Sequence, residues 1–218
     1  MISYDTVYTG GSGEIVEKKS RFIAQVFPVE TEEEVLQILE ETRKKYWDAR
    51  HNCYAFVLGA GGEITRCSDD GEPSGTAGRP ILEVLTGRRL RNVLGIVTRY
   101  FGGTLLGTGG LVRAYSQSAQ AGIAASRVIT KQAGCLLTVD TDYNGIGKLQ
   151  YLAAQSGLAV LDTVYTESVQ MKVLVPTELC GSVQKEITEA TSGQAGISQD
   201  EAEVYFACID KEIVVFDA

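Results

Sequence analysis

The chain has 218 residues, of which 44% are hydrophobic, and a formal net charge of −8. This length suits one large or two modest domains, and the composition is sufficient for a packed core. The chain contains no apolar run of about 18 residues and no basic segment leading into an apolar one, so we expect a cytoplasmic protein without a membrane partner. The negative net charge argues against a nonspecific nucleic-acid binder.

The first part of the chain is predicted to combine strands with one amphipathic helix. Residues 2–8, 14–17 and 21–27 are rich in β-branched and aromatic residues and predict strands. Thr31 stands three residues before Glu34, which is the spacing of a capping box and predicts a helix start. Acidic residues fill the first turn of this helix and basic residues fill the last, so we interpret these charges as helix electrostatics.

The next two strands are predicted at residues 52–58 and 63–66. His51 and Cys53 would share one face of the first of these strands, because side chains alternate along a strand. One interpretation is a Cys–His nucleophile pair, for which Asp48 is the nearest orienting residue. The alternative is an inert cysteine in the core.

The cysteines are far apart, form no Cys-x-x-Cys pair and accompany a single histidine. Their odd number predicts reduced, mostly buried thiols and no disulfide framework. A conventional zinc site is not expected either, and the sequence predicts no metal and no cofactor. The five residues are Cys53, Cys67, Cys135, Cys180 and Cys208.

A long polar loop covers residues 68–79 and contains three carboxylates, Asp69, Asp70 and Glu72. Together they could hold a divalent cation, although the spacing does not match a calcium-binding loop. The alternative is an ordinary surface turn. Long polar loops carry function disproportionately often, so we retain these residues as a possible loop site.

A glycine-rich stretch follows the apolar strand predicted at residues 93–97 and precedes a helix predicted at residues 111–125. Glycine-rich turns that lead into a helix present free N–H groups and favour an anion. The stretch lacks the Gly-Lys-Ser/Thr ending of a phosphate loop and the spacing of a dinucleotide-binding motif. The alternative is that the glycines only make a tight turn. The predicted anion or nucleic-acid site consists of Arg21, Arg50, Arg99, Gly102, Gly103, Gly107, Gly109, Gly110 and Arg113.

The charge balance changes near residues 131–134 and predicts a boundary between domains 1–132 and 133–218. Residues 1–134 contain 16 basic and 15 acidic residues, whereas the rest contains 4 basic and 13 acidic residues. The second domain is predicted to have the strand-helix-strand-strand-helix-strand order of a ferredoxin-like fold, which makes the chain an α+β protein. Because this domain is acidic and lacks a basic-aromatic RNA motif, any anion-binding face is assigned to the first domain.

Four blocks in the first domain resemble the signature of the YigZ/IMPACT family. The clearest reads Arg-Tyr-Phe-Gly-Gly at residues 99–103 and Leu-Gly-Thr-Gly-Gly-Leu-Val-Arg-Ala-Tyr at residues 106–115. The other blocks are residues 19–24, 49–55 and 69–78, and the second domain resembles that of the bacterial members. The resemblance implies a first domain similar to the second domain of ribosomal protein S5 and a second domain similar to the last domain of elongation factor G.

The resemblance also implies a role linked to translation. Eukaryotic IMPACT relatives regulate translation under amino-acid stress by competing for an activator of an initiation-factor kinase. They carry an additional N-terminal domain that does not precede these blocks, so kinase regulation is not carried over to this chain.

Three functions remain open from the sequence. The first is a non-enzymatic binding protein whose first domain holds RNA phosphate, on the ribosome or elsewhere, or another anion. The second is a metal-dependent hydrolase of a small substrate that uses Asp69, Asp70, Glu72 and His51. The third is a regulator that binds only proteins, through its acidic second domain. Catalytic residues are not identified by the sequence.

Overall fold

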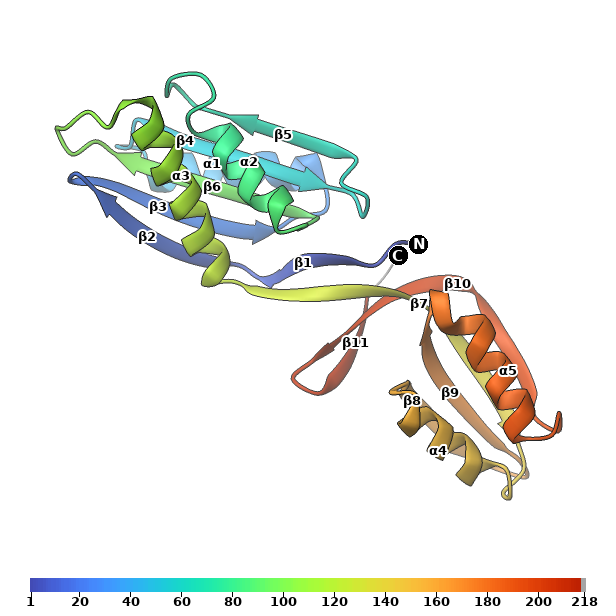
Figure 1. Cartoon of the computed structure of the whole chain (residues 1–218). Coiled ribbons are helices and arrows are strands. Elements are labelled where there is room, and N and C mark those ends of the chain that lie inside the picture. Colours follow the sequence, from blue (N-terminus) through green and yellow to red (C-terminus); the bar gives the residue numbers. More distant parts are fainter. Residues whose placement is uncertain (217–218) are drawn as a thin grey trace. The chain divides into compact units, whose positions relative to one another are not determined.

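The computed structural model describes residues 1–216 and divides into two compact units (Figure 1). The first unit comprises residues 4–130. The second comprises residues 131–216 together with residues 1–3. Both units mix helices and strands, in agreement with the mixed α/β class predicted from the sequence.

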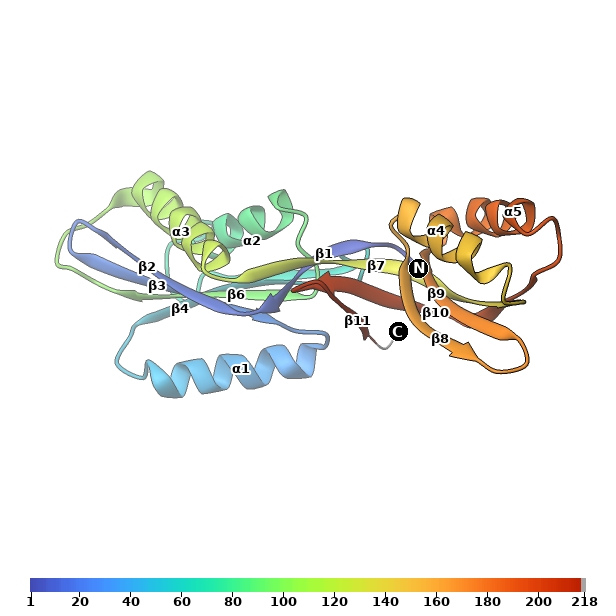
Figure 2. The same ribbon diagram turned by 90° about the horizontal axis from the view of Figure 1, so that it is seen from below.

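The first unit is an antiparallel sheet with helices on both faces. Its strands follow the order β2-β3-β6-β4-β5. Helix α1 covers one face, and α2 and α3 cover the other (Figure 2). The elements are β1 (Tyr4–Thr9), β2 (Gly11–Glu17), β3 (Ser20–Pro28), α1 (Glu32–Lys45), β4 (His51–Leu58), β5 (Ile64–Ser68), α2 (Gly78–Gly87), β6 (Val93–Tyr100) and α3 (Gly107–Ala124).

Alternation along the central strand β6 produces two separate cores in this unit. Val93 and Val97 pack toward α2 and α3, whereas Leu94 and Ile96 pack toward α1. Buried on both faces, β6 is an almost continuous apolar run, as the sequence indicated. Arg99 continues the row of Val93 and Val97, so its side chain lies on the α2 and α3 face.

The predicted start of α1 is confirmed by its cap. The side chain of Thr31 accepts a hydrogen bond from the Glu34 N–H at 3.2 Å. The Glu34 carboxylate in turn accepts a hydrogen bond from the Glu30 N–H at 2.7 Å. The first bond satisfies a backbone donor that the first turn of a helix leaves without a partner, and the second ties the residue before the cap to that turn.

The second unit is an antiparallel sheet of order β11-β10-β7-β9-β8, with α4 and α5 on one face (Figure 2). Its elements follow the predicted strand-helix-strand-strand-helix-strand order, and a final strand is added. They are β7 (Arg127–Thr141), α4 (Ile146–Gln155), β8 (Ala159–Tyr165), β9 (Val169–Pro176), the 3-10 helix η1 (Thr177–Leu179), α5 (Cys180–Ala190), β10 (Gly196–Ile209) and β11 (Glu212–Phe216). Strand β7 starts shortly after the end of α3, within the first unit, and continues into the second.

The prediction of reduced thiols is wrong for one pair of cysteines. Cys135 on β7 and Cys180 at the start of α5 form a disulfide inside the apolar core of the second unit. The sequence could not reveal this, because 45 residues separate the two and only the packing of α5 brings them together. Cys53 is a buried free thiol, whereas Cys67 and Cys208 are exposed.

Helix α3 begins earlier than predicted, at Gly107 and not at residue 111. The glycines and the threonine of residues 107–110 therefore form its first turn, although glycine is a poor helix former. Within residues 1–216, no helix combines the length and apolar character that crossing a membrane would require.

Candidate functional site

The connection from β6 to α3 is held against the β2–β3 turn by a glycine. The Gly102 N–H donates a hydrogen bond to the Ser20 hydroxyl at 3.1 Å. A Cβ atom at Gly102 would lie 2.0 Å from the Lys19 carbonyl carbon, so any larger residue would displace the loop. At the other end of the loop, Gly107 has a φ of +71°, which glycine adopts without strain. Glycines thus fix both ends of the loop.

The first turn of α3 lacks a side-chain cap. Its N-cap residue is Leu106, whose side chain cannot accept a hydrogen bond. Gly107, Thr108 and Gly109 are exposed, so water reaches the backbone of this turn. Uncapped N–H groups and the helix dipole together place partial positive charge at such a helix end.

A cavity of about 430 Å³ lies in front of this helix end; we call it the α3 cavity. Its rim is partly apolar, since the side chains of Phe101 and Leu105 are 52% and 83% exposed. This volume is within the range of small-ligand sites. The lining residues are Arg50, His51, Glu72, Pro73, Arg99, Phe101, Leu105, Leu106, Gly107, Thr108 and Leu111.

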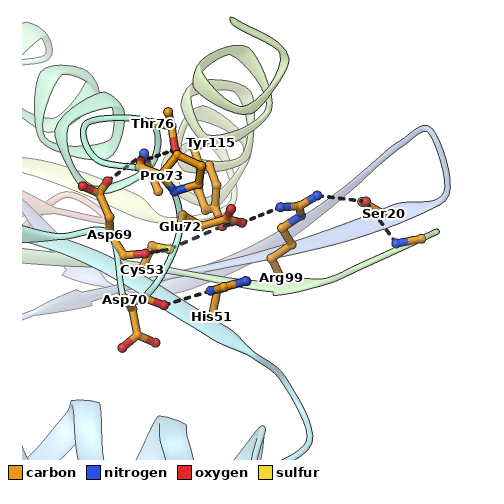
Figure 3. Close-up of polar contacts among 12 residues, drawn as sticks. Ser20, His51, Cys53, Asp69, Asp70, Glu72, Pro73, Thr76, Arg99 and Tyr115 are labelled. Atoms are coloured by element: carbon orange, nitrogen blue, oxygen red, sulfur yellow. Dashed lines mark hydrogen bonds and ion pairs between the residues drawn. The ribbon is translucent and has the colours of Figure 1, made fainter. Parts of the chain in front are cut away.

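A buried ion pair forms the floor of the α3 cavity (Figure 3). The Arg99 guanidinium donates to the Glu72 carboxylate at 2.5 Å, and both side chains are almost fully buried. The same carboxylate oxygen accepts a hydrogen bond from the Tyr115 hydroxyl at 2.8 Å. The Arg99 guanidinium also lies over the rings of Phe22 and Phe101, at 5.3 and 5.7 Å. The charge of Arg99 is therefore neutralised inside the protein, and its Nε, which is buried, has no hydrogen-bond partner.

Cys53 is unsuited to nucleophilic attack at neutral pH. Burial raises the pKa of its thiol to about 12, so the thiolate is scarce. Its Sγ donates to the Asp69 carbonyl oxygen at 3.0 Å and contacts the Tyr115 hydroxyl at 3.3 Å. Burial also raises the pKa of Tyr115, and the neighbouring Cys53 and Glu72 reinforce the shift. Both groups are protonated members of a buried hydrogen-bond network.

His51 faces the polar loop and not Cys53, although the two residues share one face of β4 (Figure 3). Its Nδ1 lies 2.9 Å from the Asp70 carbonyl oxygen. A carbonyl oxygen only accepts hydrogen bonds, so the Nδ1 atom of His51 carries a hydrogen and donates it. The other ring nitrogen, Nε2, takes no part in this bond. The sequence-based Cys–His pair has no contact between its two side chains in Figure 3.

The three carboxylates of the polar loop serve three different partners. Asp69 accepts hydrogen bonds at 2.8–2.9 Å from the N–H groups of Gly75, Ala77 and Gly78, which lie just before and at the start of α2. Burial would raise the Asp69 pKa, but these hydrogen bonds lower it below its ordinary value. Asp70 accepts from the Asn52 N–H at 2.7 Å, and Glu72 binds Arg99. No group of three or more His, Cys, Asp or Glu residues that could hold a metal occurs within residues 1–216.

The four arginines of the predicted anion site fall into two groups, according to whether a carboxylate binds them. Arg21 forms a two-point ion pair with Glu14 at 2.8 and 3.0 Å, and Arg99 is bound to Glu72. Arg50 and Arg113 are exposed and have no carboxylate partner in the described part of the chain.

Arg113 lies beside the exposed turn. Its Nη1 is 3.7 Å from the position that a Cβ of Gly109 would occupy, so its side chain extends back toward the helix start. Gly107 lines the α3 cavity, Gly110 packs on Leu106, and Gly103, at a φ of +84°, lies in the loop between.

Sequence reasoning missed Tyr115, Ser20 and Phe101 as parts of this site. A signal existed for Tyr115, because helical spacing put it on the buried stripe and a buried tyrosine hydroxyl requires a partner. Ser20 carried no such signal, since only the pairing of β3 with β6 brings it to Arg99. Phe101 is two residues after Arg99, but its spacing alone does not show that the guanidinium lies over its ring.

These features define a class of protein with two mixed α/β domains, the first of which carries an open helix end above a buried ion pair. Residues 18–123 match the Impact N-terminal domain, and residues 139–194 match a domain of unknown function, DUF1949. The chain is 39% identical to the IMPACT family member YvyE of Bacillus subtilis, over 91% of this chain and 92% of the relative. The chain belongs to the IMPACT family.

The chain is also similar to a second curated relative and to a solved structure. The IMPACT family member YigZ of Escherichia coli is 34% identical over 81% of this chain and 87% of its own length. A crystal structure described as that of a hypothetical protein is similar with a TM-score of 0.59 and 29% identity. It covers 93% of this chain and 100% of the solved chain.

Proposed function

We propose that this IMPACT family member is a non-enzymatic, translation-linked binding protein whose first domain holds a phosphate group of RNA in the α3 cavity. The observation that supports this most directly is the uncapped first turn of α3, open to solvent at the cavity that Arg50 lines. Backbone N–H groups at a helix start bind phosphate without a dedicated side chain. Such a role would place the protein in the cytoplasm, on RNA or on the ribosome.

Within this proposal the arginines have different tasks. Arg50 and Arg113 supply positive charge to the anion, because no carboxylate neutralises them in the described residues. Arg99 instead supports the cavity floor through Glu72 and Tyr115. Arg21 adds little charge, since Glu14 compensates it.

The hydrolase alternative receives less support. Asp69, Asp70 and Glu72 are each bound to a different internal partner, so they do not converge on one point. Cys53 is a buried, protonated thiol. A general base without a nearby nucleophile or cation is a weak basis for catalysis.

We further infer that the domains span residues 1–132 and 133–218. In this proposal the first is related to the second domain of ribosomal protein S5, and the second is a ferredoxin-like domain related to the last domain of elongation factor G. The strand order β10-β7-β9-β8 with two helices on one face supports the ferredoxin-like description.

Fluorescence anisotropy with a labelled oligouridylate tests the proposal. We expect binding that weakens with salt, and a slope of log affinity against log salt that falls by about 0.7 for Arg50→Ala. Arg88→Ala is the matched control, because Arg88 is exposed at the C-cap of α2 and does not line the cavity. Equal affinities and slopes for the two variants, or no binding by the wild type at low salt, would rule the proposal out.

A further inference from the structure

Trp47 is the only tryptophan of the chain, and its side chain is 82% exposed. It lies in the short connection between α1 and β4. A tryptophan ring contributes strongly to stability only when it is buried, so this ring does little for the fold. Its neighbour Tyr46 is different, because the Lys45 ammonium lies over the Tyr46 ring at 5.2 Å.

The connection that carries Trp47 is fixed on both sides. The Tyr46 N–H donates to the Thr42 carbonyl at 2.9 Å, and the Ala49 N–H donates to the Tyr46 carbonyl at 3.0 Å. The next side chain, Asp48, accepts a hydrogen bond from the Tyr100 hydroxyl at 2.7 Å. A backbone held at these points presents the indole to solvent in a defined place, which lowers the entropy cost of a contact with a partner.

Basic residues flank Trp47 in the sequence. The last turn of α1 contains Arg43, Lys44 and Lys45, and Arg50 follows Trp47. Glu40 pairs with Lys44 at 2.7 Å, and Asp70 lies 3.9 Å from Arg43. Lys45 and Arg50 have no carboxylate partner among residues 1–216. The one carboxylate between residues 43 and 50 is Asp48, which Tyr100 already engages, so a negatively charged partner fits this surface.

Trp47 is also near a cavity residue in the chain. Arg50 lines that cavity and is only three residues beyond Trp47, so their Cα atoms are separated by at most about 11 Å. An exposed aromatic ring beside unpaired cations is the arrangement on which unpaired bases stack while the backbone follows positive charge. The bases of a duplex are already stacked on one another and are not available for this contact.

We propose that Trp47 is a stacking platform for a base of single-stranded RNA whose backbone phosphate is held in the α3 cavity. This inference rests on the proposed function and deepens it, because it specifies the ligand as a single strand of several nucleotides. A free phosphate ion or a duplex would occupy the cavity without engaging the ring.

Because Trp47 is the sole tryptophan, the tryptophan emission of the chain comes from this ring alone. The full chain is titrated at low salt with oligouridylate, a duplex of matched charge, inorganic phosphate and hexaglutamate. We expect the single strand to quench the Trp47 emission and the other three probes to leave it unchanged. Trp47→Ala should weaken oligouridylate binding on the order of tenfold, and Trp47→Phe should retain most of the affinity. Tyr151→Ala is the matched control, because Tyr151 is an equally isolated ring, 69% exposed, in the second unit.

The outcomes separate this inference from the proposed function. If oligouridylate binds, loses affinity in Arg50→Ala and leaves both Trp47 emission and the affinity of Trp47→Ala unchanged, the stacking platform is wrong and the cavity proposal stands. If no nucleic acid binds, both fail. Quenching by hexaglutamate as strong as that by oligouridylate would also overturn the inference, because the surface would then be one for acidic proteins.

Discussion

The two units bury different kinds of stabilising contact. The first places an ion pair, Arg99 with Glu72, against its core and leaves a cavity above it. The second closes its apolar core with the disulfide between Cys135 and Cys180. A core closed by apolar contacts and a covalent bond serves stability, whereas buried charge next to an open cavity is costly and is characteristic of a functional site. The comparison therefore favours the first unit for the proposed ligand site.

The largest expected effect on stability comes from removing one member of the buried ion pair. Arg99→Met leaves the Glu72 carboxylate buried without its cation, which should lower the free energy of unfolding by about 3–5 kcal/mol. Urea unfolding measures this loss. The double variant Arg99→Met with Glu72→Gln should recover most of it, because no charge remains buried. A double variant as unstable as the single one would show that the pair is not the source of the cost.

The corresponding change in the second unit is slightly smaller. The disulfide closes a segment of 45 residues, and loop-closure entropy gives it a stabilising effect of up to about 4 kcal/mol. Reduction, or Cys180→Ser, should lower the melting temperature of the second unit while oligouridylate binding stays unchanged. Cys208→Ser is the control, since this cysteine is free and exposed. Identical melting in oxidised and reduced protein would contradict the prediction.

A third prediction concerns pH and the loop that borders the α3 cavity. Hydrogen bonds lower the Asp69 pKa in the folded state, so the carboxylate stabilises the protein above its unfolded pKa of about 3.9. This contribution is lost as the pH falls through the lower, folded pKa. Asp69→Asn should cost about 1–2 kcal/mol at neutral pH, as for other helix caps.

Urea unfolding as a function of pH measures this effect. The difference in stability between wild type and Asp69→Asn should shrink toward zero in acid. Asp162→Asn, which changes an exposed carboxylate on β8, should show no such pH dependence. A wild-type to Asp69→Asn difference that is constant down to the lowest pH would contradict the assignment.

The smallest effect on stability has the opposite sign. Gly109→Asp places a carboxylate in the first turn of α3, where the helix dipole favours it and a better helix former replaces glycine, for a gain of about 1 kcal/mol. The nearest atom to a Cβ there is Arg113 Nη1 at 3.7 Å, so the substitution fits. The same carboxylate would occupy the proposed anion position, and oligouridylate affinity should fall. A more stable variant with unchanged RNA affinity would move the site away from this turn.

Local signals were sufficient for most of the fold. The capping box at Thr31, the apolar run at residues 93–97 and the helical spacing of Leu111 and Tyr115 are properties of short segments, and each predicted its element. The start of α3 was misjudged because four residues of poor helix propensity, 107–110, adopt helix when the turns that follow are anchored in the core.

The candidate site was predictable only in part. The sequence identified the glycines and the arginines, but a side chain's partner is set by strands and helices that are distant in the chain. Arg99 and Glu72 are 27 residues apart, and their pairing neutralises a residue that the sequence offered for anion binding. The anion site itself stays a prediction, now narrowed to Arg50, Arg113 and the first turn of α3.

The sequence by itself determined the type and order of the elements, the family and the acidic character of the second domain, because each depends on residues close together in the chain. Only the tertiary structure decided which charges are compensated, which cysteines are joined and where a cavity opens, because these depend on packing between segments far apart in the chain. Exposure belongs to the same category, because only the packing shows that the Trp47 ring is left in water.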